Sequence, residues 1–216
     1  MLPANTIYEG DATQLLRRQP AESVDLICTD PPYGNNTAYG LGHRTIANDT
    51  SPLIGLLGLE EAIRTLKRNR FCICFLGQTH LPFFDNFIRR YTALKIRSYI
   101  VWDKARIGLG YGVRPQHELI AVLEKGRPPF SNSGIPSVLT FARASATHHP
   151  HAKPVELLRY LIHNFSSPGQ LVLDPFVGSG STAVAAKLLD RRYIGIEIDP
   201  AHVKVARHRV DTTEQK

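Results

Sequence analysis

The most informative segment of the chain is Leu171-Val172-Leu173-Asp174-Pro175-Phe176-Val177-Gly178-Ser179-Gly180-Ser181-Thr182-Ala183. Its apolar beginning predicts a buried strand, and residues 182–189 have the apolar periodicity of a helix. Glycines between a strand and a helix allow the backbone to approach a ligand closely, with the amino end of the helix facing that ligand. This order of strand, glycine-rich turn and helix is typical of an α/β domain that binds a nucleoside.

An acidic residue for the same ligand follows further along the chain. The apolar run that begins at Tyr193 predicts the next strand, and Glu197 closes it about 20 positions after the first glycine of the turn. Folds of this kind hold the ribose hydroxyls of a cofactor with an acidic residue at that spacing. We therefore predict a nucleoside-cofactor site in which Gly178, Gly180 and Glu197 take part.

A second motif, Thr29-Asp30-Pro31-Pro32-Tyr33-Gly34, follows a mostly apolar run that also predicts a buried strand. Because prolines lack an N–H group, the chain here can neither extend the strand nor begin a helix at once. The resulting turn offers the Asp30 carboxylate and prolyl carbonyl oxygens as acceptors beside the ring of Tyr33. This combination suits a planar heterocycle with an amino group, such as adenine or cytosine. A plain Pro-Pro turn with an exposed tyrosine is the alternative, and the glycine-rich segment decides against it.

Together the two motifs resemble those of the DNA amino-methyltransferases that use S-adenosylmethionine, in the permuted order of the beta class. In that class the target-amine motif comes first and the cofactor motif last. The resemblance also includes residues 99–104, His117-Glu118, and a nearly unbroken stretch from His149 to Arg209, so it covers most of the chain. It implies an α/β fold, a Rossmann-like seven-stranded methyltransferase sheet that is circularly permuted. The implied organisation is a single domain of residues 1–216 with a small recognition insert at about 126–151.

The resemblance also implies which residues hold S-adenosylmethionine. Lys153 would pair with the methionine carboxylate, Glu197 would accept the ribose hydroxyls, and Ile198 would pack on the adenine. The full implied set is Asp11, Ala12, Asp30, Lys153, Asp174, Phe176, Gly178, Gly180, Ser181, Thr182, Glu197 and Ile198. Simpler interpretations stay open for some of them: core packing for Phe176 and Ile198, a solvated lysine at a helix start for Lys153, and a helix N-cap for Asp11.

The expected chemistry is methyl transfer to an exocyclic amine. That amine is a poor nucleophile because its lone pair is delocalised into the ring, and acceptance of its two N–H hydrogens by Asp30 and the Pro31 carbonyl would release the lone pair. Pro32 completes the turn. Since the amine is unreachable inside a duplex, the base must be flipped out, and Tyr33 can stack on it. An aspartate at the first motif position favours adenine N6, with cytosine N4 as the alternative.

The formal net charge of +7 is compatible with DNA as the partner. Three loops around the expected crevice lack acidic residues, and phosphate contacts dominate nucleic-acid affinity. The candidate DNA-contacting residues on these loops are Arg44, Lys104, Arg106, Arg114, Arg127 and Arg143. A second subunit could add contacts, so a homodimer is compatible with the sequence.

The remaining composition points to an ordinary reduced α/β protein. Cys28, Cys72 and Cys74 lie in apolar runs without metal-ligand spacing, which predicts free core thiols. His148, His149 and His151 have no second ligand cluster, and the family pattern accounts for His149, so we expect no metal. No signal-peptide pattern and no membrane-length apolar run is present, and a cytoplasmic protein is expected.

Periodicity predicts the other elements. Strands are expected at 6–8, 24–28, 71–76, 97–102, 117–123, 138–141, 171–173 and 193–199, and helices at 12–18, 52 to about 68, 81–91, 154–165 and 182–189. Alternation of strands and helices implies a largely parallel sheet covered on both faces. If the strands that precede the two motifs are neighbours, the amine site and the cofactor site share one crevice.

Three other functions fit part of the sequence. A nicotinamide-dependent dehydrogenase also matches the glycine pattern plus Glu197, but it would leave the Asp30 motif without a role. A protein-glutamine methyltransferase resembles this family but carries asparagine at the position of Asp30. A catalytically inactive DNA-binding module is disfavoured because the Asp30 motif is intact.

Overall fold

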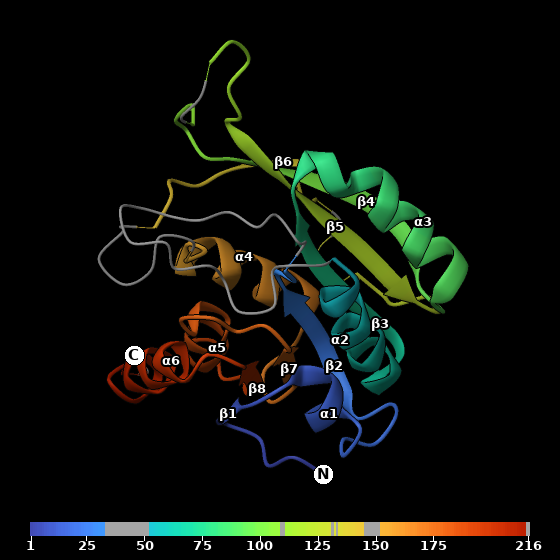
Figure 1. Ribbon diagram of the computed structural model, residues 1–216, viewed down its shortest axis with the longest axis vertical. Helices are drawn as coiled ribbons and strands as arrows, with labels where there is room; N and C mark the ends of the chain where they lie inside the picture. Colours follow the sequence, from blue (N-terminus) through green and yellow to red (C-terminus); the bar gives the residue numbers. More distant parts are fainter. Residues whose placement is uncertain (33–51, 109–110, 131, 133, 145–151, 215–216) are drawn as a thin grey trace.

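The computed structural model describes residues 1–32, 52–108, 111–130, 132, 134–144 and 152–214. Within these ranges the strands form one mixed sheet with the order β1-β8-β7-β2-β3-β5-β4-β6 (Figure 1). The strands are β1 (Thr6–Glu9), β2 (Val24–Thr29), β3 (Leu66–Leu76), β4 (Lys95–Asp103), β5 (His117–Lys125), β6 (Val138–Thr140), β7 (Leu171–Asp174) and β8 (Arg192–Glu197). The helices are α1 (Ala12–Leu16), α2 (Pro52–Thr65), α3 (Leu81–Tyr91), α4 (Val155–Phe165), α5 (Ser181–Lys187) and α6 (Pro200–Asp211), with a 3-10 turn at Gln78–His80.

The sheet is largely parallel, as the alternation of elements predicts. Strands β1, β8, β7, β2 and β3 pair in parallel in that order, whereas β5 runs antiparallel to both β3 and β4. The sheet has one strand more than the seven that the family resemblance implies, because β6, which periodicity predicts at 138–141, pairs in parallel with β4 at the edge. The first and last segments of the chain meet at the other edge, where β1 pairs with β8.

The helices cover both faces of the sheet (Figure 1). Buried residues form two clusters, one between the sheet and α4, α5 and α6, and the other between the sheet and α1, α2 and α3. Strand β2 is buried along its whole length and supplies both clusters: Leu26 and Cys28 belong to the first, and Ile27 to the second. This alternation is the two-residue period of a strand between two apolar layers.

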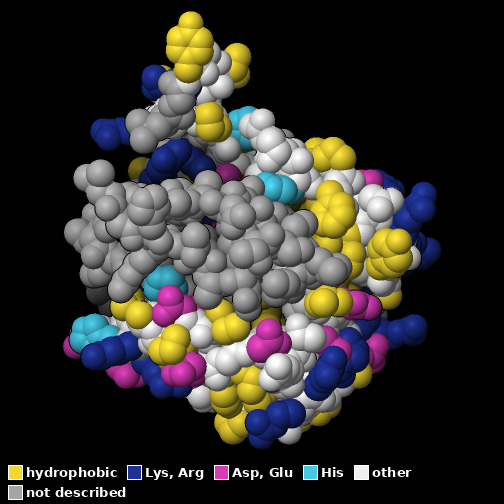
Figure 2. All heavy atoms as spheres, in the orientation of Figure 1, with side chains coloured by type: hydrophobic (Ala, Val, Ile, Leu, Met, Phe, Trp, Pro, Cys, Tyr) yellow, Lys and Arg dark blue, Asp and Glu magenta, His cyan; other side chains and the backbone are white. Residues whose placement is uncertain are grey.

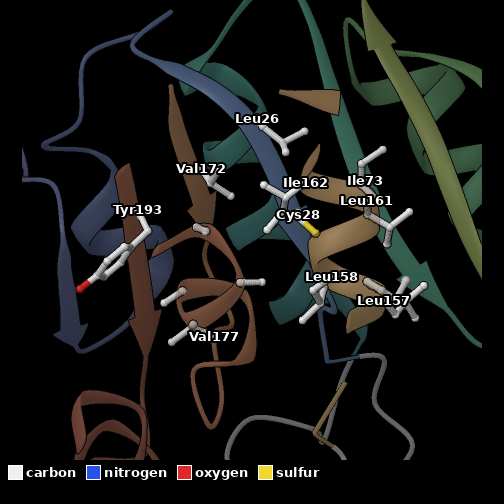
Figure 3. Packing of buried hydrophobic residues seen from close by; sticks show 14 of the residues in the cluster. Leu26, Cys28, Ile73, Leu157, Leu158, Leu161, Ile162, Val172, Val177 and Tyr193 are labelled. Carbon is white, nitrogen blue, oxygen red and sulfur yellow. The ribbon is translucent and has the colours of Figure 1, made fainter. Parts of the chain in front are cut away.

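The centre of the first cluster is packed by α4 (Figure 3). Four buried side chains of this helix, Leu157, Leu158, Leu161 and Ile162, face the strands. They contribute to the cluster that contains Leu26 and Cys28 of β2, Ile73 of β3 and Val172 of β7. Full burial of each such aliphatic side chain is worth about 1.5–3 kcal/mol. The packing fixes α4, and with it the residues that precede α4, against the carboxyl ends of β2 and β3.

The boundary between α2 and β3 differs from the prediction. The helix ends at Thr65 rather than near residue 68, and β3 begins at Leu66 rather than at residue 71. Tertiary pairing decides this boundary, since Leu66 pairs with Val24 of β2 and Arg70 pairs with Lys125 of β5. Local periodicity could not show these partners, and such contacts override helix propensity.

The charged residues at the start of β3 form ion pairs with a buried carboxylate of β2. Asp25 of β2 accepts the backbone N–H of Leu171 at 3.0 Å and forms ion pairs with Lys67 at 2.8 Å and Arg70 at 3.4 Å. Burial by itself would raise the pKa of Asp25, but the hydrogen bonds from Leu171 and Lys67 and the two positive charges outweigh burial and lower this pKa. The charged residues therefore tie β3, β2 and β7 together.

Cys28, Cys72 and Cys74 are buried in the core, as their apolar surroundings in the sequence predict, and no disulfide joins them. Burial raises the pKa of Cys28 and of Cys72 well above its usual value. In the part of the chain that the structure describes, no helix combines the length and the apolar character needed to span a bilayer.

Candidate active site

The two motifs leave the sheet from neighbouring strands. Strands β2 and β7 pair in parallel, with Leu26 opposite Val172 and Ile27 opposite Leu173. The Asp30 motif and the glycine-rich turn follow the carboxyl ends of these two strands. Ligands of open α/β sheets bind at such an edge, so both motifs face the same side of the molecule.

Asp174 connects the two motifs directly. Its carboxylate is buried and accepts a hydrogen bond from the Thr29 hydroxyl at 2.7 Å and one from the Phe176 backbone N–H at 3.1 Å. Burial raises the pKa of Asp174 to about 6, against the opposing hydrogen bonds from Thr182, Thr29 and Phe176, and the nearby Asp30 carboxylate adds to the increase. This residue therefore organises the start of the glycine-rich turn.

The two glycines of the turn serve different purposes. Gly180 has a φ of +86° and a Cβ there would lie 2.9 Å from Ala206 Cα, so α6 packs too closely for any side chain. Gly178 has a φ of +52°, yet a Cβ built on it would meet nothing within 4 Å. The backbone at Gly178 is therefore open toward the crevice, which is the arrangement that the close approach of a cofactor needs.

A basic side chain from α6 holds the turn from the other side. Arg209 donates to the Ser179 carbonyl at 2.7 Å and to the Ser181 hydroxyl at 3.2 Å. Ser181 and Thr182 are both buried, and the Thr182 hydroxyl is engaged by Asp174. These two predicted cofactor residues thus also stabilise the turn.

Glu197 ends β8 next to the open backbone. Its Oε2 accepts the N–H of Gly178 at 2.9 Å, and its Oε1 accepts the N–H of Asp199 at 2.9 Å. A carboxylate oxygen can accept more than one hydrogen bond, so both oxygens retain capacity for hydroxyl donors. The next residue, Ile198, is 36% exposed and lies outside the core. Core packing, the simpler interpretation of this side chain, is therefore wrong.

Asp11 and Ala12 lie beside Glu197. The N–H of Gly10 donates to the Glu197 carbonyl at 2.9 Å, which brings the start of α1 to the end of β8. Asp11 is the N-cap of α1 and accepts the Gln14 N–H at 2.9 Å. The N-cap role is therefore confirmed, and the second oxygen of this carboxylate leaves room for the predicted cofactor contact.

Glycines of α2 let that helix lie against both motifs. A Cβ on Gly55 would be 2.2 Å from the Pro32 carbonyl oxygen, and a Cβ on Gly58 would be 2.7 Å from the ring of Phe176. Phe176 also packs against the cluster on the α1–α3 face, so the core-packing interpretation holds for this residue. The helix consequently sets the distance between the prolyl turn and the glycine-rich turn.

The amine site contains a charge network that the motifs did not show. Lys153 forms ion pairs with Asp30 at 2.6 Å and with Glu118 at 3.0 Å, and Glu118 pairs with Lys104 at 2.5 Å. Glu118 was not among the predicted site residues, although its place in the family-like His117-Glu118 pair was a signal for it. Only the sheet reveals the position of Glu118. Strand β5 lies one strand away from β2, with β3 between them, and the start of β5 lies near the carboxyl end of β2.

The pKa values in this network follow from its charges. Burial by itself would lower the pKa of Lys153, but the carboxylates of Asp30 and Glu118 outweigh burial and raise this pKa. In the same way, burial would raise the pKa of Glu118, but Lys153 and Lys104 lower it. Lys153 and Glu118 are therefore both charged at neutral pH, and a buried ion pair persists only when its partners are charged.

Four of the predicted DNA-contacting residues lie on or beside the connection between β4 and β5. Arg106 and Arg114 are exposed on the connection between β4 and β5, which projects from the body and carries exposed apolar side chains (Figure 2). Arg143 lies beside this connection, with a guanidinium nitrogen 3.5 Å from a Cβ built on Gly108. Lys104 is mostly buried in the charge network, with 11% of its side chain exposed.

Some predicted residues are not brought to this edge. Arg127 follows the end of β5. Because β5 is antiparallel to β3, this residue lies at the opposite ends of the strands from the two motifs. Tyr33, Arg44, His148, His149 and His151 lie outside the described residues. Among the described residues, no group of three or more His, Cys, Asp or Glu side chains could hold a metal ion.

Comparison with known proteins agrees with this geometry. The model of a family described as DNA methylase matches residues 24–208. A putative methylase, YubD of Escherichia coli K12, is 34% identical over 211 residues, covering 96% of this chain and 90% of the relative. The DNA adenine methyltransferase YhdJ of the same organism is 30% identical over 248 residues, covering 96% of this chain and 83% of the relative.

A solved structure shares the fold at lower identity. The PvuII DNA methyltransferase, described as cytosine-N4-specific, superposes with a TM-score of 0.79 at 18% identity, covering 97% of this chain and 87% of the other. Both proteins therefore have the Rossmann-like methyltransferase fold that the order of the motifs implies. The similarity concerns the sheet and its helices and leaves the choice of base open.

Proposed function

The chain belongs to the DNA methylase family, and from this premise we propose that it methylates the N6 amine of an adenine flipped out of double-stranded DNA. It is a DNA methyltransferase whose cofactor is S-adenosylmethionine. The observation that carries the proposal is the parallel pairing of β2 with β7. It places the carboxylate of Asp30 and the open backbone of Gly178 at one edge of the sheet.

The residues around Gly178 fit the cofactor. Glu197 retains acceptor capacity for the ribose hydroxyls, the exposed Ile198 offers an apolar surface for the adenine, and Asp11 lies beside them. When bound, S-adenosylmethionine supplies an electrophilic methyl group on a positively charged sulfur. The chain's own contribution is to hold the methyl group in line with the target amine. In-line positioning of two reactants can supply roughly 7–11 kcal/mol of the barrier reduction.

At the amine site, Asp30 and the Pro31 carbonyl accept the two N–H hydrogens of the target. The amine nitrogen then becomes pyramidal and its lone pair becomes available for attack. The proton leaves after methyl transfer, so no strong base is required beforehand. Tyr33 would stack on the flipped base, a contact worth about 1–3 kcal/mol, and this remains a prediction because Tyr33 lies outside the described residues.

Adenine is favoured over cytosine by the residue at position 30. In the family, aspartate at the first position of the motif is commoner in the adenine enzymes and serine in the cytosine enzymes. Cytosine N4 is the alternative target. A nicotinamide-dependent oxidoreductase, which also fits the glycine pattern, is disfavoured because the Asp30 motif lies directly beside that turn.

We also propose a single catalytic domain of residues 1–216 with recognition confined to a short insert at about 126–151. Among the described residues of that insert, β6 is the one strand and it pairs with β4 in the sheet, so we infer that few side chains remain to read base edges. Since one good bidentate contact gives about 1–3 kcal/mol of discrimination, we expect a short or relaxed target sequence. A cytoplasmic location completes the proposal, and a second subunit could supply further DNA contacts.

The decisive experiment is methylation of unmodified duplex DNA of mixed sequence by the purified protein, followed by mass spectrometry of the nucleosides. We expect N6-methyladenine in DNA treated with the wild type and none with Asp30→Ala. N4-methylcytosine as the product would establish the alternative. Absence of any methylated nucleoside, with the cofactor shown to bind by calorimetry, would overturn the proposal.

A further inference from the structure

The amine acceptor is tied to a lysine that has two carboxylate partners. Lys153 Nζ lies 2.6 Å from Asp30 Oδ2 and 3.0 Å from Glu118 Oε2. The three residues come from distant parts of the chain: Asp30 follows β2, Glu118 lies in β5, and Lys153 lies just before α4. The contact therefore depends on the packing of α4 against the sheet.

The surroundings of Lys153 make this arrangement strong. Its side chain is only 14% exposed, and its ammonium lies 5.2 Å from the ring centre of Phe75 and 5.9 Å from that of Trp102. A cation largely removed from water needs anionic partners to remain there, and aromatic faces add favourable interaction. The ammonium is thus fixed in place by its partners, in contrast to a solvated lysine at a helix start.

The proposed reaction places a specific demand on Asp30. Its carboxylate must accept one N–H hydrogen of the target amine while it also accepts the Lys153 ammonium. Only the ionised form can do both, because protonation turns one oxygen into a donor. Three acidic groups meet near this edge, since Asp30 lies close to Asp174 as well as to Glu118 through the shared lysine. Mutual repulsion among them would favour protonation of one carboxylate unless a positive charge compensates.

We propose that Lys153 is a positioning residue for the amine acceptor, which keeps Asp30 ionised and oriented, and that Glu118 limits how strongly Lys153 binds Asp30. The inference rests on the proposed methyl transfer for its purpose, but the ion pairs themselves are independent of it. Glu118 is in turn neutralised by Lys104. Among the described residues, the charged groups that face Lys153 are Asp30 after β2 and Glu118 in β5, with Lys104 after β4 and Asp174 at the end of β7 beyond them.

This role differs from that of a lysine devoted to the methionine carboxylate. An ammonium has three N–H donors, and two of them point to the carboxylates of Asp30 and Glu118. A cofactor ligand would affect mainly the affinity for S-adenosylmethionine. A positioning residue would instead affect the pH at which Asp30 gains a proton, and removal of Lys153 or of Glu118 would shift that pH in opposite directions.

The test follows the protonation of Asp30 in the protein without cofactor and the rate of methyl transfer in the complete system. The carboxyl carbon resonance of Asp30, assigned by its loss in Asp30→Asn, is titrated in the wild type, Lys153→Met, Lys153→Arg and Glu118→Gln. Single-turnover methylation is then measured over the same pH range. Lys125→Met and Glu124→Gln are matched controls, because both residues lie in the opposite half of β5 and the side chain of Lys125 is 15% exposed.

We expect Lys153→Met to move the titration midpoint of Asp30 and the acid limb of the rate profile upward by about 1–3 pH units. Lys153→Arg should largely restore both, Glu118→Gln should move the midpoint downward, and the controls should leave it unchanged. Should Lys153→Met fail to fold, the downward shift in Glu118→Gln tests the proposal alone. Unchanged midpoints, or shifts of the same sign in Lys153→Met and Glu118→Gln, would overturn the inference. A wild type that methylates no DNA would overturn the proposed function, while the titration would still decide the role of Lys153.

Discussion

The hydroxyl of Thr29 donates a hydrogen bond of 2.7 Å to the carboxylate of Asp174, although the two residues are 145 positions apart in the chain. Thr29 ends β2 directly before the target-amine motif, and Asp174 ends β7 directly before the glycine-rich turn. One buried bond thus couples the segment proposed to hold the base to the segment proposed to hold the cofactor. Both partners are almost completely buried, so solvent cannot replace either one.

Thr29→Val should lower the free energy of unfolding by about 1.5–3 kcal/mol, the range for a lost hydrogen bond to a charged group. The substitution preserves shape and leaves Asp174 with one acceptor site unfilled. Urea denaturation without cofactor measures the effect. Thr6→Val is the matched control, because the Thr6 hydroxyl bonds only locally to the Ala4 carbonyl at 3.2 Å. Equal losses in the two variants would contradict the coupling.

Asp174→Asn should change how stability depends on pH. Burial raises the pKa of Asp174 in the folded protein to about 6 from a usual value of 3.8, so the folded state binds this proton more tightly than the unfolded chain. Its stabilising contribution is therefore complete below about pH 4 and is lost as the pH rises through about 6.

The asparagine variant has no such proton. Its free energy of unfolding relative to the wild type should increase between about pH 4 and about pH 7, by at most about 3 kcal/mol. Denaturation of both proteins at several pH values, without cofactor or DNA, measures this difference. A difference that does not vary with pH would show that folding does not raise the pKa of Asp174.

Asp30→Ala should abolish methyl transfer, because the target amine loses its acceptor. Binding of S-adenosylmethionine should be largely retained, since the glycine-rich turn and Glu197 remain intact. Rates from labelled cofactor and dissociation constants from calorimetry separate the two effects. Retention of more than a few per cent of the wild-type rate would refute the role assigned to Asp30.

Glu197→Ala should weaken the binding of S-adenosylmethionine by about 1–3 kcal/mol. The carboxylate would no longer accept the ribose hydroxyls, and it would also release the N–H groups of Gly178 and Asp199. Titration calorimetry at a temperature well below unfolding measures the affinity. Glu197→Gln keeps one acceptor and should bind with intermediate affinity. An unchanged dissociation constant in Glu197→Ala would remove this residue from the site.

Arg106→Ala and Arg114→Ala should each reduce DNA affinity nearly equally for all sequences. Each loss of a phosphate contact should also make the dependence of log affinity on log salt shallower by about 1. Arg68→Ala is the control. The side chain of this arginine is 83% exposed, and it lies near the start of β3, at the opposite ends of the strands from the site. Fluorescence titrations at several salt concentrations provide the slopes. A slope unchanged in both variants but reduced in Arg68→Ala would place the DNA on the other edge.

Much of the fold could be predicted because its signals are local. The apolar run of β2 and the strand, turn and helix around Gly178 each occupy a few consecutive residues. Turn chemistry is equally local: prolines after Asp30 end β2 wherever it lies in the fold. The end of α2 was one error, since residues 66–70 have no local feature that distinguishes a helix end from a strand, and helix α6 (Pro200–Asp211) was not predicted at all.

The sequence by itself determined the two motifs, their order and therefore the family, because those depend on which residues follow one another. Only the tertiary structure decided that Asp174 binds Thr29, that Lys153 lies between Asp30 and Glu118, and that Arg127 is at the wrong edge for the site. Such contacts depend on the order of strands in the sheet and on the packing of α4. Neither is encoded by local periodicity, since strand order is settled by the burial of apolar surface summed over the whole chain.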